Sequence, residues 1–233
     1  IGVIKMEVFR NMPPQNNFLT RIRELASRKG IVLIFDECTS GFRETFGGLH
    51  KKYGVEPDIA VYGKTLGNGY AITAVVGREE VMQSAQNTFI SSTFWTERIG
   101  PTAALKTLEV MERETPWEHA TGLGLYLRDL WQQLAHRHGL QIDISGLPSL
   151  SGFTFQSPRH LAYKTLITQE MLKKGYLAGT ACYVSLAHTR AVFDSYAQAL
   201  DPIFGLIKQC EDGRDIDLLL EGPVCHAGFQ RVN

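Results

Sequence analysis

Short apolar runs alternate with longer amphipathic segments in the first part of the chain. The runs cover residues 3–9, 31–37, 58–64 and 71–77. The second, "IVLIFDE", is continuously apolar until two closing carboxylates, which is typical of a parallel strand buried on both faces. Helical spacing extends from about residue 17 to 29, and Gly30 ends it. Strand, helix and strand joined by short connections predict an α/β sheet.

The second half has a different pattern of apolar and polar residues. A long helical stretch covers about residues 99–114, breaks at Pro116 and resumes to about residue 138. Beyond residue 140, strand-like pieces at 141–144, 152–156 and 182–186 alternate with helical segments at 162–174 and 190–212. The pattern predicts two domains. One is a larger α/β domain over residues 1–115; the other, over residues 116–233, is a connecting helix with a small C-terminal α/β domain.

Composition narrows the class of protein. The chain has 233 residues, is 44% hydrophobic and carries 24 basic and 24 acidic residues, a balance that offers no charged surface for nucleic acid or anionic membranes. No apolar run approaches the roughly 20 residues of a membrane span. The 4 cysteines are scattered without a C-x-x-C pair, which favours reduced thiols and a cytoplasmic location.

The chain opens on Ile1, directly inside the first apolar run, with neither an initiator methionine nor a signal-peptide pattern. A native protein seldom begins inside a core strand. We therefore expect that residues upstream of Ile1 belong to the native protein.

The stretch "AVYGKTLGNG", residues 60–69, places Lys64 between glycines after a strand-like run. A phosphate-binding loop would need a glycine at position 58, where the chain has Asp58, whose carboxylate would repel the anion. A dinucleotide fingerprint starting at Gly67 would need its third glycine at Ile72. Both patterns fail, so the remaining chemistry is a lysine that forms a covalent bond.

Candidate partners for Lys64 follow the strand-like run 31–37, which ends in Asp36 and Glu37. Ligands of α/β sheets bind at the carboxyl ends of the strands, where these residues and Lys64 are expected. A lysine that forms a Schiff base needs an aldehyde, and pyridoxal phosphate, whose ring nitrogen pairs with a carboxylate, is the commonest. Taken singly, a strand-end carboxylate is more often a cap and a Gly-Lys turn more often surface.

Three motifs in this order resemble a known family. They are "FDECTSGFR" at residues 35–43, "PDIAVYGKTLGNG" at 57–69 and "STF" at 92–94. The chain resembles the second half of a class III pyridoxal-phosphate-dependent aminotransferase. Within that family, its residue pattern is most similar to the glutamate-1-semialdehyde 2,1-aminomutase branch. The resemblance implies the transferase fold type I, with residues 1–115 forming the C-terminal part of the large mixed-sheet cofactor domain.

The same resemblance implies roles for individual residues. Lys64 is the Schiff-base lysine and later the base that moves a proton between substrate and cofactor. Asp36 pairs with the protonated pyridine nitrogen. Thr39 stands where many relatives have a glutamine near the phenolic oxygen of the ring. Thr93 matches a residue that reaches the cofactor phosphate of the neighbouring subunit, although a helix N-cap is its ordinary alternative. Glu37 is expected to be structural.

The resemblance also implies the cofactor pyridoxal 5'-phosphate, a small-molecule amino donor and carbonyl acceptor, and a homodimer with a shared active site. Tyr62, Phe94 and Trp95 are expected to pack around the site. After "STF" the chain departs from the family by reading Trp95-Thr96-Glu97, which would narrow the substrate channel or alter the subunit contact. The phosphate-binding glycine-serine turn and the ring-stacking aromatic of the family have no counterpart in the chain.

Three functions stay open on the sequence. The first is aminotransfer between two molecules, the second is an intramolecular aminomutase, and the third is an incomplete, non-catalytic fragment. Arg159 and Arg190 are candidates for binding a substrate carboxylate, and surface ion pairs explain them equally well.

Overall fold

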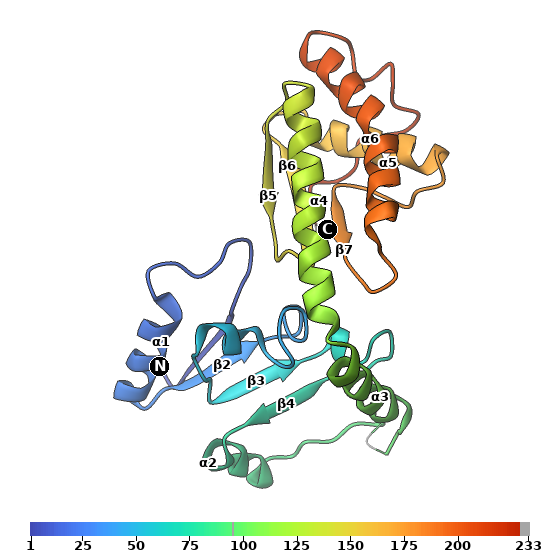
Figure 1. Ribbon diagram of the computed structural model, residues 1–233. Coiled ribbons are helices and arrows are strands. Elements are labelled where there is room, and N and C mark those ends of the chain that lie inside the picture. The colour runs from blue at the N-terminus through green and yellow to red at the C-terminus, as the bar shows by residue number, and fades with distance from the viewer. Residues whose placement is uncertain (95, 229–233) are drawn as a thin grey trace. The chain divides into compact units, whose positions relative to one another are not determined.

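A computed structural model describes residues 1–94 and 96–228, and residues 95 and 229–233 lie outside this description. The chain divides into two compact units, Ile1–His119 and Ala120–Asn233 (Figure 1). This division lies four residues from the domain boundary predicted between residues 115 and 116. The assignment of the units as a cofactor domain and a small domain stays a prediction at this point.

The first unit is built on a four-stranded sheet. Its strands are β1 (Val3–Glu7), β2 (Val32–Asp36), β3 (Ile59–Tyr62) and β4 (Ala74–Gly77), and they lie in that order. β2 is parallel to both of its neighbours, β1 and β3, as its continuous apolar run predicted, whereas β4 is antiparallel to β3. The sheet is therefore mixed (Figure 1).

One face of this sheet is covered by α1 (Phe18–Lys29), which begins after Asn17 and ends at Gly30 as predicted. Gly30 adopts a φ of 63°, the left-handed conformation that a helix C-terminus favours for glycine. Leu33 and Phe35 of β2 point to the covered face and are completely buried, whereas Ile34 and Asp36 on the opposite face are half-buried. The alternation of the strand thus separates a packed face from a more open one.

The helical stretch predicted from residue 99 to 138 is present as α3 (Ile99–Glu114) and α4 (Pro116–Arg137). Thr115 separates the two helices with a φ of 43°, and Pro116 occupies the first position of α4, where its missing N–H costs no helical hydrogen bond. Between β4 and α3 lie α2 (Glu79–Met82) and the 3₁₀ helix η3 (Gln83–Asn87). Within the described residues, no helix combines the length and apolar character needed to cross a membrane.

The second unit contains an antiparallel sheet in the order β5 (Ile142–Ser145), β6 (Leu150–Phe155) and β7 (Ala181–Tyr183). Its helices α5 (His160–Lys173) and α6 (Arg190–Glu211) agree with the sequence pattern. The strand predicted over residues 182–186 was wrong in its second half. β7 ends at Tyr183, and the backbone N–H of Ser185 donates to His188 Nδ1 at 3.1 Å rather than to a neighbouring strand.

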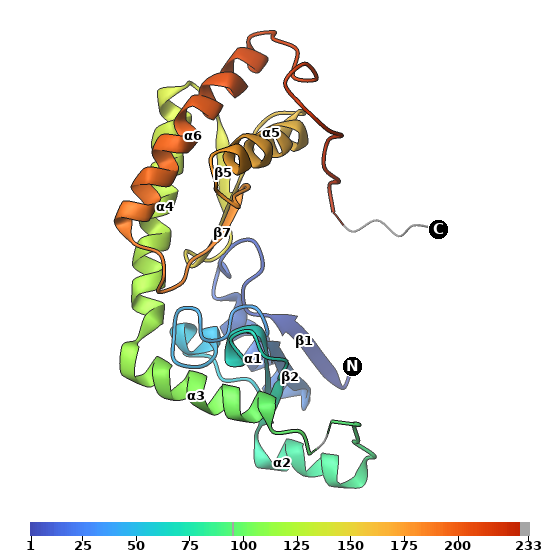
Figure 2. The same cartoon turned by 90° about the vertical axis from the view of Figure 1, so that its right-hand side faces the viewer.

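An aromatic core fills the second unit on one face of its sheet. Phe153 and Phe155 share that face of β6, and Trp131 of α4 lies 4.8 Å from Phe153, ring centre to ring centre. Tyr163 of α5 and Phe204 of α6 lie 5.6 and 5.3 Å from Phe155. Three helices therefore pack on the same face, and α4 and α6 run side by side in both views (Figures 1 and 2).

Replacing Phe153 by alanine is expected to destabilise the protein by about 3–5 kcal/mol, because the ring lies between Trp131, Phe155 and Phe204. Urea unfolding followed by tryptophan fluorescence measures the loss. Leu177, which is 96% exposed, is the control, and its replacement by alanine should change stability by less than about 0.5 kcal/mol. Equal effects of the two substitutions would contradict this core.

Candidate active site

Strand pairing brings Asp36 and Lys64 to the same edge of the first sheet. In the parallel pair β2–β3, Asp36 lies opposite Val61, and the N–H of Glu37 continues the ladder by donating to Val61 O at 2.8 Å. Lys64 follows two residues after the end of β3 and opens the 3₁₀ turn η2 (Lys64–Leu66). The carboxyl ends of two adjacent parallel strands therefore carry the predicted carboxylate and the predicted amine.

Lys64 has an unusual backbone. Its φ of 44° lies in the left-handed region, which costs a residue with a Cβ about 1–3 kcal/mol. Hydrogen bonds hold this conformation in place: Leu66 N–H donates to Gly63 O at 3.0 Å, and Gly67 N–H donates to Lys64 O at 3.1 Å. The side chain is exposed, and Lys64 Nζ donates to Thr39 Oγ1 at 2.6 Å. Two of the predicted site residues are thus in direct contact.

Asp36 is an ionised carboxylate with two partners. Lys5 Nζ of β1 lies 3.0 Å from Asp36 Oδ2, and the backbone N–H of Cys38 donates to Asp36 Oδ1 at 3.2 Å. Burial would raise the pKa of Asp36, but these two hydrogen bonds outweigh it and hold the pKa below its ordinary value. The sequence pattern did not indicate Lys5 as a site residue. Its signal was a charge inside the apolar run 3–9.

Cys38 is a second residue that the pattern missed. It follows the Asp36-Glu37 pair, and a Cβ placed on Gly63 would lie 3.5 Å from Cys38 Sγ, so the thiol fills space between the two strand ends. Burial raises the pKa of Cys38, and Asp36 raises it further. The thiol is therefore neutral at neutral pH and serves as a packing group in this arrangement.

Thr93 is not brought to this cluster. It lies exposed in the segment before α3, which begins at Ile99. The N-cap alternative for Thr93 was wrong: Arg98 is the residue before the helix, and Glu97 Oε1 accepts the N–H of Ile99 at 2.6 Å. A carboxylate two residues ahead of Ile99 takes the capping bond. The phosphate role of Thr93 stays a prediction.

Of the three aromatic residues expected to pack around the site, the structure describes Tyr62 and Phe94, and Tyr62 packs within this chain. Tyr62 is half-buried with its ring 5.4 Å from that of Phe42, and burial together with the charge of Glu37 raises the pKa of Tyr62 to about 12. Phe94 is 75% exposed within this chain, so its packing around the site stays a prediction. Trp95 lies outside the described residues, and so does its part in the Trp95-Thr96-Glu97 departure.

The two candidate arginines have different environments within the second unit. Arg159 donates to Cys210 O at 2.7 Å and lies 3.8 Å from the carboxylate of Glu211, so its guanidinium has a structural use. The guanidinium of Arg190 lies 4.5 Å from the ring centre of Tyr126, a cation–π contact at the start of α6. Neither environment identifies a substrate group.

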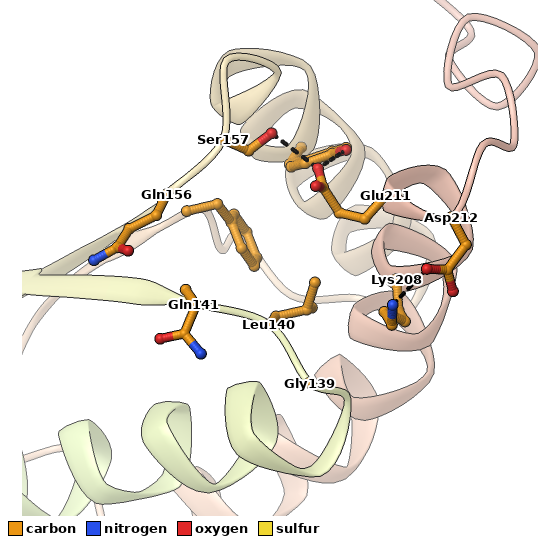
Figure 3. A pocket seen from close by; sticks show the side chains of 10 residues that line it. Gly139, Leu140, Gln141, Gln156, Ser157, Lys208, Glu211 and Asp212 are labelled. Carbon is orange, nitrogen blue, oxygen red and sulfur yellow. Dashed lines mark hydrogen bonds and ion pairs between the residues drawn. The ribbon is translucent and has the colours of Figure 1, made fainter.

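A cavity of about 290 Å³ lies in the second unit beside the C-terminal end of α6 (Figure 3). Its charged side chains already have partners among the residues that line it. Glu211 accepts hydrogen bonds from Ser157, at 2.8 Å, and from Tyr163, while Lys208 Nζ lies 2.5 Å from Asp212. These mutual contacts favour a structural role for the groups lining the cavity, and the cluster in the first unit remains the candidate site.

Solved structures share this fold. The FumI protein of Sphingopyxis sp. MTA144, solved in its PLP internal aldimine form, superimposes with a TM-score of 0.83 at 23% identity, covering 94% of this chain and 55% of that chain. An S-selective transaminase from Arthrobacter sp. gives a TM-score of 0.73 at 24% identity, covering 90% and 52%. The fold is that of the fold-type-I pyridoxal-phosphate-dependent transferases, as predicted.

Sequence comparisons identify the family. The class III aminotransferase family matches residues 11–201, and the chain belongs to it. A 3-aminobutyryl-CoA aminotransferase of Cloacimonas acidaminovorans (strain Evry) is 35% identical over 199 residues, covering 79% of this chain and 48% of the relative. A glutamate-1-semialdehyde 2,1-aminomutase of Natranaerobius thermophilus is 30% identical over 220 residues, covering 86% and 51%. The chain thus spans about half the length of these relatives.

The cofactor of this family is pyridoxal 5'-phosphate, and the observed cluster has the groups that fit it. Lys64 presents an exposed amine, which can bond covalently to an aldehyde. Asp36 is ionised and already accepts a hydrogen bond from a nitrogen cation, Lys5, so it can accept one from a protonated ring nitrogen. Lys5 is itself largely exposed, with 60% of its side chain accessible, and can move aside.

Replacing Lys5 by methionine is expected to raise the pKa of Asp36, because the substitution removes a hydrogen bond and a positive charge that stabilise the carboxylate. NMR titration of the Asp36 carboxyl carbon in the protein without cofactor measures the change. The control is Lys106→Met, which removes a lysine paired with Glu109 and should leave Asp36 unaffected. An unchanged pKa in Lys5→Met would contradict the ion pair.

Proposed function

We propose that the protein carrying this chain transfers amino groups with pyridoxal 5'-phosphate and that Lys64 and Asp36 are its catalytic residues. The observation that carries the proposal is the joint position of three groups at the ends of β2 and β3. An exposed amine, the hydroxyl that it contacts at 2.6 Å, and an ionised carboxylate lie at one edge of the sheet. Family membership supports the same conclusion.

When bound, pyridoxal phosphate supplies an aldehyde that condenses with amines and a ring that accepts electrons from the substrate carbon. Lys64 Nζ would be the amine that holds the cofactor covalently. When free, the same Nζ would act as the base that moves a proton between the substrate carbon and the cofactor. Thr39 Oγ1, which accepts from Nζ, orients this amine. Asp36 keeps a proton on the ring nitrogen because it stays ionised.

The proposed substrates are a small-molecule amino donor and a carbonyl acceptor. The similarity to an aminotransferase that is named for 3-aminobutyryl-CoA supports transfer between two molecules. A second candidate, an intramolecular aminomutase, is favoured by the relatives named glutamate-1-semialdehyde 2,1-aminomutase, at 30% and 28% identity. Transfer needs both a donor and an acceptor, whereas an aminomutase turns over with a single substrate.

We also propose a cytoplasmic homodimer with a shared active site, in which Thr93 and Thr39 complete the binding of the cofactor. Supporting the dimer, the segment around Thr93 exposes large apolar side chains that a second copy could cover. These are Phe89, Ile90, Phe94, Ile99 and Leu105. The four free cysteines fit a reducing compartment. We propose that the cofactor phosphate is bound mainly by the segment that the relatives have and this chain does not span.

Replacing Lys64 by alanine in the full-length protein should abolish the visible absorption band that pyridoxal phosphate acquires on a lysine amine. It should also lower amino transfer by at least about 10²–10⁴-fold, the usual contribution of a positioned proton-transfer group. Absorption spectra and an amino-donor assay measure the two effects. Lys52→Ala is the matched control, since Lys52 is paired with Glu44 and lies outside the cluster.

Retention of both the band and turnover in Lys64→Ala would contradict the assignment of Lys64. Loss of both in Lys52→Ala as well would show that the variants report stability rather than chemistry. A wild-type protein that binds the cofactor through Lys64 but acts on no amine would support the non-catalytic alternative.

A further inference from the structure

Glu37 is a buried charge next to the site. Alternation along the chain places its side chain on the opposite side from Asp36, and none of it is exposed. Its carboxylate accepts hydrogen bonds from three donors. His50 gives two of them to Oε1, from its backbone N–H and from Nδ1, both at 2.9 Å. Ser40 Oγ gives the third to Oε2.

These bonds close the turn that contains Thr39. The side chains of Glu37 and Ser40 are joined, and the N–H of Gly41 donates to Glu37 O at 2.8 Å. Thr39 therefore sits inside a turn that is closed twice. The two bonds from His50 fasten the same turn to the start of η1 (Leu49–Tyr53), thirteen residues further along the chain. The turn is therefore restrained at both ends, which reduces the number of backbone conformations open to it.

Tyr62 supports the turn from the other strand. A Cβ on Gly41 would lie 2.7 Å from Tyr62 Cδ1, and a Cβ on Gly48 would lie 2.8 Å from its hydroxyl. The ring is thus pressed between two glycines, one at each end of the loop from residue 41 to 48. Tyr62 precedes Lys64 by two residues, so this contact links the turn to the strand that leads to the lysine.

Glu37 remains ionised in this setting. Burial would raise the pKa of Glu37, but the hydrogen bonds from His50 and Ser40 outweigh it and hold the pKa below its ordinary value. His50 Nε2 points to Glu56, whose carboxylate lies 3.5 Å away and is mostly exposed. Removing one of the three donors is costly, because it leaves part of the buried Glu37 charge without a hydrogen bond.

We propose that Glu37, Ser40 and His50 form a positioning device that holds Thr39 Oγ1 against the amine of Lys64. The use of that amine rests on the proposed function, whereas the positioning does not and can be tested without cofactor. Glu37 acts through Thr39 and touches neither substrate nor cofactor. It is accordingly a positioning residue rather than a catalytic one.

The test measures how fast Lys64 reacts with limiting acetic anhydride in the full-length protein without cofactor, by peptide mass spectrometry against exposed Lys29 as internal reference. Thr39→Val removes the acceptor of the lysine hydrogen bond and should speed labelling by about 2- to 10-fold, the range of one ordinary hydrogen bond. Glu37→Gln removes the charge and replaces one of the two acceptor oxygens by an N–H donor, so it should also speed labelling. Combined with Thr39→Val it should add no further increase, because both changes act on the same contact.

His50 provides a matched pair of variants. Asparagine at position 50 can place an amide N–H near the position of Nδ1. In His50→Asn, Lys64 should therefore react with acetic anhydride at close to the wild-type rate. His50→Leu keeps the backbone N–H donor but loses the side-chain donor at Nδ1, so it should speed the labelling of Lys64. Asp58→Asn is the stability control. Asp58 is another buried carboxylate of the same unit, bound to Arg23 and to the N–H of Leu33, and its loss should leave Lys64 labelling unchanged.

Wild-type labelling in Glu37→Gln and His50→Leu would overturn the proposal, and so would effects that multiply in the double variant. If Glu37→Gln does not fold, Ser40→Ala removes only one of the three donors and should give a smaller increase. Wild-type labelling in that variant would then overturn the proposal. The labelling assay contains no cofactor, so its results test the positioning of Thr39 even if the proposed amino-transfer function is wrong.

Discussion

The parallel pairing of β2 with β3 is the constraint on which the candidate site depends. Its register places Asp36 beside Val61, so the carboxylate and Lys64 leave the sheet at one edge. A shift by one residue would turn Asp36 toward the packed face and bring Glu37 to the open one. Complete burial of Leu33 and Phe35 opposes such a shift, because both would have to face solvent. The hydrophobic core therefore fixes the chemistry at its edge.

Two unfavourable features lie close to this edge. Lys64 has a left-handed backbone, and Glu37 is a charge without solvent. Each is held by local hydrogen bonds, the first within η2 and the second from Ser40 and His50. Strained and buried charged residues persist where the surroundings determine their position. The local hydrogen bonds of the first unit therefore offset the free-energy cost of the two features that hold the Thr39 hydroxyl and the Lys64 amine at a fixed distance.

Much of this arrangement could be predicted from the sequence, for physical reasons. The continuous apolar run 31–37 indicated the parallel strand β2, Gly30 marked the C-terminal end of α1, and Pro116 marked the start of α4. Lys5 and Cys38 could not be found this way, because their contacts with Asp36 and Gly63 depend on strand register and turn shape.

The central claim is that the edge formed by β2 and β3 holds the cofactor through Lys64. Reduction of the full-length protein with borohydride in the presence of pyridoxal phosphate, followed by peptide mapping, tests it directly. Reduction makes the bond between cofactor and amine permanent, so the modified peptide reports which lysine held it. The account predicts one adduct, on Lys64. An adduct on another lysine, or none at saturating cofactor, would contradict it.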